Sequence, residues 1–368
     1  MLAAATLAVT HAKPAKDNDR VGSPNVAREN AAALQWLSGA LALATIAFAL
    51  LAVRVIAATP YEQAIASALV VLWPTFTTET CKLGNDVLVY CFGAASLWLL
   101  ASWQTSERPV TIVLAAVMAG AALNAKLNGG VSALLVVAMV LARALRPPRG
   151  KTRLPRGVLV ALGALAVFGG VLADTVIRLK QGHLGNGTSS LTRVPDHFMN
   201  FVRLDLASFR ETPWAFQEGA AHGRDYFWNY LFRTSLFDEY RSSRPVLEVS
   251  GYWLSAAAAA LLPFTARGVL SFARAAFRRV TDGRRTMFVA LLGWLGFAVL
   301  YRAVYPYVST NDFRYILLVV VPLASATAAG AGAVMRRFGK RHVHLAALAG
   351  GIVLVFGVAS LEIVLDWS

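Results

Sequence analysis

Apolar residues gather along the chain into ten runs of about 15–22 residues, separated by short stretches that carry Arg, Lys, Gly or Pro. A helix of about 20 apolar residues is long enough to cross the hydrocarbon core of a bilayer. The pattern therefore predicts an all-α integral membrane protein, a multi-span helical bundle of about ten transmembrane helices. The predicted spans are residues 34–53, 62–75, 86–103, 110–124, 129–145, 157–177, 247–266, 287–304, 314–335 and 344–364.

Composition agrees with this pattern, and the placement of charge predicts how the chain is oriented in the membrane. With 57% hydrophobic residues and a mean hydropathy of +0.55, the chain is too apolar for a soluble protein. A net charge of +15 in a soluble chain would suggest a nucleic-acid partner. Here, however, 16 of the 35 basic residues lie in three short loops, at residues 143–156, 267–285 and 336–341. The positive-inside rule makes these loops cytoplasmic, so we expect a lipid bilayer and no nucleic acid as partner.

The polar motifs fall on the other face of the membrane. Counting spans outward from the basic loops places five regions on the outer side: residues 1–33, Lys82–Asp86, Asn124–Asn128, 178–246 and Pro306–Asp312. Catalysis or recognition is therefore expected at the outer face.

The chain is expected to have four parts. Residues 1–33 form an outer N-terminal tail, and residues 34–177 form a first bundle of six spans. Residues 178–246 are mostly polar but hold aromatic stretches such as "RDYFWNYLFRTSLFDEY", which are typical of helices that lie in the membrane interface. This outer loop subdomain precedes a second bundle of four spans, residues 247–368.

Asp86 and Lys126 are the first candidate site residues. Asp86 begins the third span, where an ionisable group is costly unless it faces protein, water or an opposite charge. It is either a functional carboxylate or a helix cap. Lys126 lies in the outer turn "ALNAKLNGG" between Asn124 and Asn128. It either reaches the lipid headgroups without a further role or binds a lipid phosphate.

A third outer motif opens the ninth span. In "NDFRYILLVVVP", Asp312 is followed by Arg314 and Tyr315. The aspartate and the arginine form either a surface ion pair of little energetic value or part of a site. Because three such motifs share one face of a small bundle, a common functional site is favoured.

These motifs, "GNDVLVY", "ALNAKLNG" and "NDFRYILLVVVP", resemble the GT-C superfamily of integral-membrane glycosyltransferases. The similarity is to bacterial members of the protein O-mannosyltransferase, aminoarabinose transferase and dolichyl-phosphate-mannose-dependent type, and it extends from about Trp36 to the end of the ninth span. It implies a bundle whose outer interfacial helices roof a cavity open to lipid. It also implies transfer of a sugar, with inversion, from a polyprenyl-phosphate carrier to an acceptor glycan, lipid or protein in the inner (plasma) membrane.

The resemblance also implies roles for individual residues. Asp86 matches the acidic residue that begins the equivalent helix and organises the catalytic site. Lys126 matches a lysine that contacts the carrier phosphate. Arg314 and Tyr315 match an Arg-Tyr pair that begins a late helix, in which the arginine is a second cation for the phosphate. Asn85, Asn128 and Asp312 are weaker neighbours in the substrate-binding set. No cofactor is predicted, and assistance by a divalent metal ion is left open.

One departure from the family concerns its principal catalytic acid, which follows a first span that runs from inside to outside. This sequence has no such span, so we expect the first span and the first outer loop to be missing. Asp17 and Asp19 in the outer tail are either replacement catalytic acids or charges of a solvated tail. The alternatives to an enzyme are a multi-span transporter and a catalytically inactive, truncated membrane scaffold.

Overall fold

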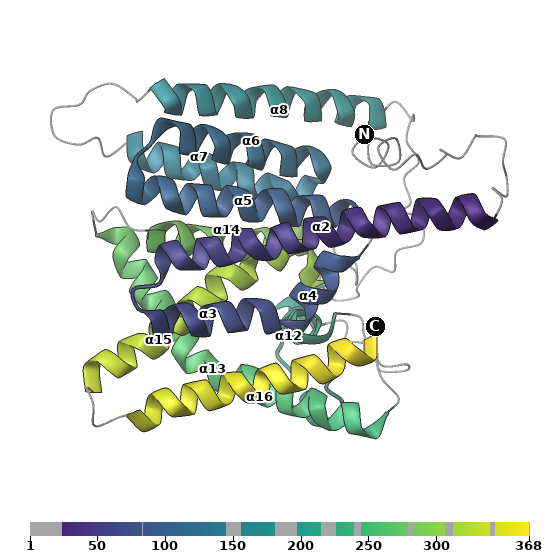
Figure 1. Cartoon of the computed structure of the whole chain (residues 1–368), viewed down its shortest axis with the longest axis vertical. Coiled ribbons are helices and arrows are strands. Elements are labelled where there is room, and N and C mark those ends of the chain that lie inside the picture. Colours follow the sequence, from purple (N-terminus) through teal and green to yellow (C-terminus); the bar gives the residue numbers. More distant parts are fainter. Residues whose placement is uncertain are drawn as a thin grey trace.

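The computed structural model is a bundle of long helices that lie side by side (Figure 1). It describes residues 24–82, 84–144, 156–180, 197–214, 226–238, 244–278, 283–305, 312–338 and 343–367. All regular structure in these residues is helical. The predicted all-α class is confirmed.

Seven helical segments are long and apolar enough to cross a membrane. They are Ala32–Ile56 of α2 (Pro24–Ile56), α5 (Asn85–Ser106), η1 with α7 (Leu127–Ala144), α13 (Pro245–Phe277), α14 (Gly283–Val304), η4 with α15 (Phe313–Arg336, within Phe313–Phe338), and Ala347–Asp366 of α16 (Val343–Trp367). The chain is therefore a multi-pass protein of the lipid bilayer.

The other three predicted spans also coincide with helices. The second corresponds to α3 (Pro60–Leu72) and α4 (Pro74–Cys81), which meet at an angle of 54°. The fourth and sixth correspond to α6 (Pro109–Ala125) and α8 (Arg156–Lys180), whose apolar stretches are shorter. All ten predicted segments are thus helical, while the number that cross the membrane stays a prediction.

The break between α3 and α4 corrects the boundaries predicted for the second span, residues 62–75. Trp73 at the junction is extended, with φ −72° and ψ 112°. Pro74 causes this, since its ring disfavours a helical conformation in the preceding residue and it has no N–H for the helix ladder. The chain therefore turns at Trp73 and begins a new helix with Pro74 in its first turn.

Two helices extend beyond their predicted ends. The span predicted at residues 247–266 belongs to α13, which continues to Phe277 and so carries Arg267 and Arg274, both expected in a loop. Long arginine side chains can cover apolar helix surface while the guanidinium reaches water, so basic residues need not end a helix. Likewise α2 begins at Pro24, inside the predicted tail, and proline is favoured in a first helical turn.

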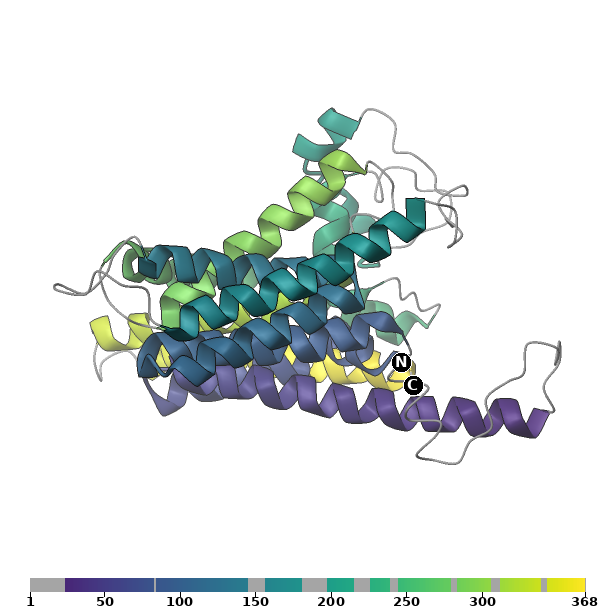
Figure 2. The same cartoon turned by 90° about the horizontal axis from the view of Figure 1, so that it is seen from above.

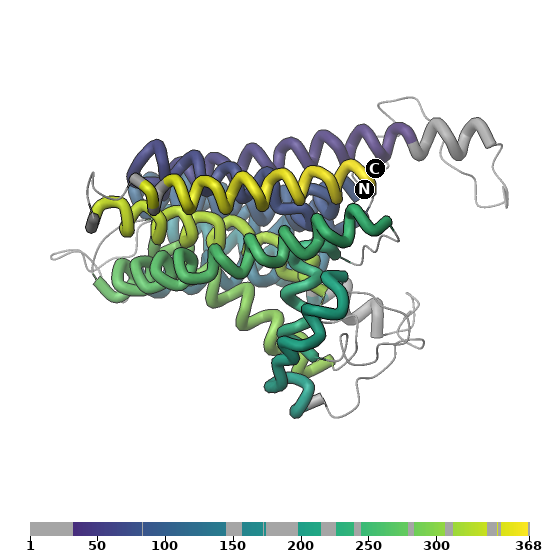
Figure 3. The backbone as a smooth tube through the Cα atoms, turned by 90° about the horizontal axis from the view of Figure 1, so that it is seen from below, coloured from purple at the N-terminus to yellow at the C-terminus, as the bar shows by residue number. Residues whose placement is uncertain are grey.

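The helices pack in two groups that share α14. In the first group α5 packs on α2 and α6, and α6 packs on α7 and α8; in the second, α13 packs on α15 and α16, and α3 packs on α15. Helix α14 contacts α13 and α5. Figures 2 and 3 show α14 inclined to the long helices beside it.

Two glycines bring α13 and α15 into direct backbone contact. A Cβ atom at Gly268 would lie 1.7 Å from the carbonyl oxygen of Ala326, and one at Gly330 would lie 1.9 Å from that of Phe264. Only glycine fits at such positions. Small residues at helix interfaces are typical of membrane bundles, where close van der Waals packing replaces the hydrophobic effect as the main driving force.

Long-range pairs join helix ends on two opposite faces of the bundle, which we name the inner end and the outer end after the orientation predicted from the sequence. At the inner end, ion pairs join Glu62 to Arg336 and Glu107 to Arg143. At the outer end, other ion pairs join the chain near residue 82 to residue 238, and residue 86 to residue 126. Figure 1 shows α4, α12 (Phe227–Phe237) and the C-terminal end of α16 together at this outer end.

Candidate functional site

Asp86 and Lys126 form an ion pair at the outer end of the bundle. The Lys126 ammonium lies 2.8 Å from each carboxylate oxygen of Asp86. The N-cap of α5 is Gly84, and no side chain caps this helix. Asp86 lies in the first turn of α5, where an acid suits the positive end of the helix dipole, and it is also bound to a lysine from another helix end.

Asp312 and Arg314 are joined in two ways. Asp312 is the N-cap of η4, and its Oδ1 accepts a hydrogen bond of 3.0 Å from the backbone N–H of Arg314. Its Oδ2 lies 3.0 Å from Arg314 Nε, an ion-pair distance without hydrogen-bond alignment. Because the Asp312 carboxylate is buried and the arginine is only partly exposed, this pair is not the solvated surface pair of the alternative interpretation.

Tyr315 connects the two ion pairs. Lys126 Nζ and Arg314 Cζ each lie 5.2 Å from the centroid of its ring, within cation–π range. Asn128, which is buried, donates a 3.3 Å hydrogen bond to the Tyr315 carbonyl. We call Asp86, Lys126, Asp312, Arg314 and Tyr315 the outer cluster.

The remaining predicted residues have different places. Asn128 supports the outer cluster through the backbone of Tyr315, as a positioning residue. Asn85 is exposed on the first turn of α5, next to Asp86. Asp17 and Asp19 lie outside the described residues.

A second polar cluster was not predicted. The Lys82 ammonium contacts Glu79 Oε1 and Asp238 Oδ2, and both carboxylates are almost fully buried. Burial alone would lower the pKa of Lys82, but the two carboxylates outweigh it and raise this pKa above its ordinary value. Asp238 has a φ of +52°, which is uncommon outside glycine. We call Glu79, Lys82 and Asp238 the Lys82 cluster.

Sequence gave a partial signal for this cluster. Lys82 stands in the same polar motif as Asp86, and Asp238 ends the aromatic stretch "FWNYLFRTSLFD" of the outer loop. Their partnership depends on the docking of α12, which no local pattern reveals.

Helix α12 closes the outer end of the bundle. The Thr75 hydroxyl donates a 2.9 Å hydrogen bond to the carbonyl of Thr234, and the Thr234 hydroxyl accepts one of 3.1 Å from the backbone N–H of Phe313. This one residue of α12 therefore connects α4 to η4. The buried Arg233 donates to the carbonyls of Ser208 and Thr212, which holds α10 (Ser208–Glu211) against α12.

An apolar groove opens beside α12. Its volume is about 670 Å³. The groove is lined by Leu204, Leu206, Phe209, Trp228 and Phe232 from the outer segments and by Tyr252, Ser255, Ala256, Ala259 and Leu262 from α13. Leu204, Leu206 and Leu262 are more than half exposed, so the groove faces the surroundings of the bundle.

A smaller cavity lies beside this groove. It has a volume of about 130 Å³ and shares Phe232 and Leu262 with the groove. Its lining also includes Trp73 and Phe313, whose rings stack at 6.4 Å. Since Phe313 precedes Arg314, the apolar lining extends to the residue next to the outer cluster.

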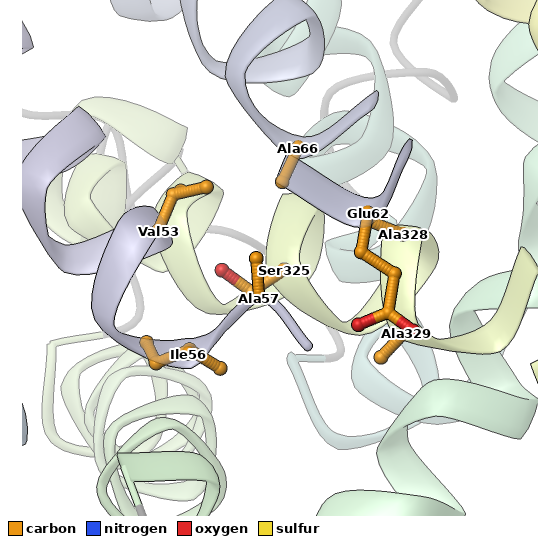
Figure 4. A pocket seen from close by; sticks show the side chains of 8 residues that line it. All are labelled: Val53, Ile56, Ala57, Glu62, Ala66, Ser325, Ala328 and Ala329. Carbon is orange, nitrogen blue, oxygen red and sulfur yellow. The ribbon is translucent and has the colours of Figure 1, made fainter. Parts of the chain in front are cut away.

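A third pocket lies at the inner end, between α2, α3 and α15 (Figure 4). Its lining residues are Val53, Ile56, Ala57, Glu62, Ala66, Ser325, Ala328 and Ala329. A volume of about 10 Å³ has room for no more than one water molecule. Glu62 beside it accepts a 2.9 Å hydrogen bond from the backbone N–H of Ala58 and pairs with Arg336. This pocket is a packing feature and does not fit an organic ligand.

Among the described residues, no three His, Cys, Asp or Glu side chains gather as metal ligands. The chain matches no protein-family model, no curated protein and no solved structure. A functional assignment consequently depends on the sequence motifs and on the geometry of the outer end.

Proposed function

We propose that the chain is a membrane glycosyltransferase that moves a sugar from a polyprenyl-phosphate carrier to an acceptor hydroxyl at the outer face of a bacterial inner membrane. The observation that carries the proposal is the pair of cations, Lys126 and Arg314, beside one tyrosine ring at the outer end. These cations come from regions far apart in sequence, and the fold brings them together.

The apolar groove and the outer cluster suit the two parts of such a carrier. A polyprenyl chain is apolar and flexible, and the groove has the volume of a small-molecule site, roughly 300–1,000 Å³ in proteins generally. The carrier phosphate is an anion, which Lys126 and Arg314 would bind. The smaller cavity shares Phe232 and Leu262 with the groove and includes Phe313, the residue before Arg314.

The chemistry of transfer fits the same groups. The acceptor hydroxyl attacks the anomeric carbon, and the bond from that carbon to the phosphate oxygen breaks. The configuration at the anomeric carbon is inverted. Charge grows on the departing phosphate, where fixed cations stabilise the transition state. The hydroxyl proton passes to a carboxylate base. Asp86 is the best placed, because a phosphate that binds Lys126 would release this carboxylate from its ion pair.

A transporter is the second candidate, since transporters use broken helices. Two breaks lie close together here, at Trp73 between α3 and α4 and at Ile316 in η4. In transporters, however, polar binding groups sit near mid-membrane. The charged groups of both clusters lie instead at the outer helix ends, which favours the enzyme.

Transfer in reconstituted membranes tests the proposal. The chain is placed in liposomes with polyprenyl-phosphate carriers of radiolabelled sugars and with glycan, glycolipid or peptide acceptors, and release of polyprenyl phosphate is measured as loss of label from the carrier. We expect release by the wild type and a loss of about 100-fold in Lys126→Ala and in Arg314→Ala, because each removes a cation from the leaving group. Arg143→Ala, which removes an ion-paired cation at the inner end, is the matched control and retains full release.

Two results would contradict the enzyme. One is folded wild type that releases no carrier with any sugar. The other is equal release by the wild type and by both outer-cluster variants. Carrier-independent uptake of a solute by the same liposomes would support the transporter instead.

A further inference from the structure

Three rings form a row at the C-terminal end of α14, two of them on the helix and the third, Tyr305, directly after it. Phe297 and Tyr301 stack at 5.4 Å with their planes 10° apart, and the rings of Tyr301 and Tyr305 lie 5.5 Å apart. The three residues are spaced by four positions, so that each stands one turn beyond the last. A ring from another element joins this row, because Tyr315 of η4 lies 5.2 Å from Tyr301.

The row connects the outer cluster to the surface. Tyr315 is bound by the cations of the outer cluster, while Tyr305, at the outer end of the row, is 48% exposed. The planes of Tyr305 and Tyr315 are tilted by 56° and 64° to that of Tyr301. Phe297 stacks on Tyr301, Tyr305 is tilted to it and Tyr315 meets it edge-on, so the row turns as it approaches the exposed ring of Tyr305.

Aromatic residues are also common at membrane interfaces without any ligand. Trp36 on α2 is an example, since it is 81% exposed. The α14 row differs in two respects. Its rings contact one another, and it ends against charged groups that the bundle holds in place.

Rings beside charged groups suit a carbohydrate. A pyranose has an apolar face of C–H bonds, which packs on an aromatic ring, and a rim of hydroxyls, which needs donors and acceptors. Tyr315 is bordered by Asp86, Lys126 and Arg314, which provide both kinds of partner. A sugar next to the carrier phosphate would lie near Tyr315, so Tyr301 and Tyr305 offer ring surface for a second sugar.

We infer that the acceptor is itself a carbohydrate, whose terminal ring packs on Tyr301 and Tyr305. The role of this carbohydrate as acceptor rests on the proposed function. Binding of a sugar to these rings does not, because it requires no turnover. A peptide rich in serine and threonine has no comparable flat apolar face, so these rings favour a glycan over such a peptide.

Saturation-transfer NMR on the full chain in nanodiscs tests the inference. The probes are methyl hexopyranosides and, for comparison, a short peptide rich in serine and threonine. We expect transfer from protein aromatic protons to sugar ring protons, and weaker or no transfer to the peptide. Tyr301→Leu should weaken sugar binding about tenfold, a loss of about 1.4 kcal/mol. Tyr301→Phe, which retains the ring, should bind as the wild type does.

Trp36→Leu is the control, because it removes an exposed aromatic residue outside the row. Sugar binding that is equal in Tyr301→Leu, in Trp36→Leu and in the wild type would overturn the inference, as would stronger transfer to the peptide. If sugar binding depends on Tyr301 but no carrier is released, the carbohydrate site stands and the transferase proposal fails. The two proposals therefore fail separately.

Discussion

The Lys126 ammonium lies 2.8 Å from both carboxylate oxygens of Asp86, which ties the turn after α6 to the first turn of α5. Each side chain is about a quarter to a third exposed. Solvent screening leaves such pairs only about 0–1 kcal/mol of stability. We therefore expect the pair to contribute little to the stability of the fold and to matter mainly for function.

Asp86→Asn should abolish sugar transfer and leave the fold intact. The amide cannot accept the hydroxyl proton, although it retains the shape of the carboxylate. The free energy of unfolding should fall by no more than about 1 kcal/mol. Carrier release and thermal unfolding in detergent are the two measurements. Transfer at the wild-type rate in this variant would remove Asp86 from the mechanism.

Lys82→Met should destabilise the protein by about 2–4 kcal/mol. The variant leaves the carboxylates of Glu79 and Asp238 buried without their cation, and an uncompensated buried charge is costly. Because Lys82 is partly exposed, we expect the loss of stability to lie toward the lower end of this range. Unfolding in detergent measures the change.

Two further variants check this cause. Lys126→Met removes a lysine whose partner is partly exposed, and it should cost no more than about 1 kcal/mol. Adding Asp238→Asn to Lys82→Met should recover part of the lost stability, because one carboxylate is removed. Equal losses for both lysines would show that burial of the partners is not the cause.

Gly268→Ala should destabilise the packing of α13 on α15. The new Cβ would lie 1.7 Å from the Ala326 carbonyl oxygen, so the two backbones must separate. Overpacking of this kind costs about 1–3 kcal/mol. Gly163→Ala on α8 is the matched control, since no atom lies within 4 Å of its Cβ position. Stability measurements that do not distinguish the two variants would contradict the direct contact.

Ala256→Trp should weaken binding of the carrier. Ala256 lines the apolar groove, and an indole there takes up space that the polyprenyl chain requires. We expect about tenfold weaker binding of polyprenyl phosphate in nanodiscs. Leu270→Trp adds an indole at an exposed position of α13 two turns beyond the groove lining and should bind normally. Unchanged binding in Ala256→Trp would place the carrier elsewhere.

The helices were predictable because hydropathy acts over whole segments. The run predicted at residues 86–103 is α5, Asn85–Ser106, and its ends differ by only a few residues. Where a predicted helix boundary was wrong, the cause lay in individual residues near that boundary. Pro74 breaks the second predicted span, and its effect could have been anticipated from the sequence. The continuation of α13 through Arg267 could not, since basic residues are compatible with both loop and helix.

The outer cluster was predicted residue by residue, but its pairings were not. The sequence places Asp86 in the first turn of a helix, but its contact with Lys126 follows only from the packing of α5 on α6. Glu79 and Asp238 are more distant still, because α12 must dock before they meet. Side-chain partnerships between remote segments depend on tertiary structure, which periodicity does not encode.

The backbone contact at Gly268 and Gly330 limits which helices can rearrange. Neither α13 nor α15 can rotate about its own axis without forcing a side chain into the facing carbonyl, so the two must move as one rigid body. The groove has one wall on α13 and the other on the outer segments near α12. Widening it to admit or release a long lipid therefore requires the outer segments to move relative to the α13–α15 pair as a whole.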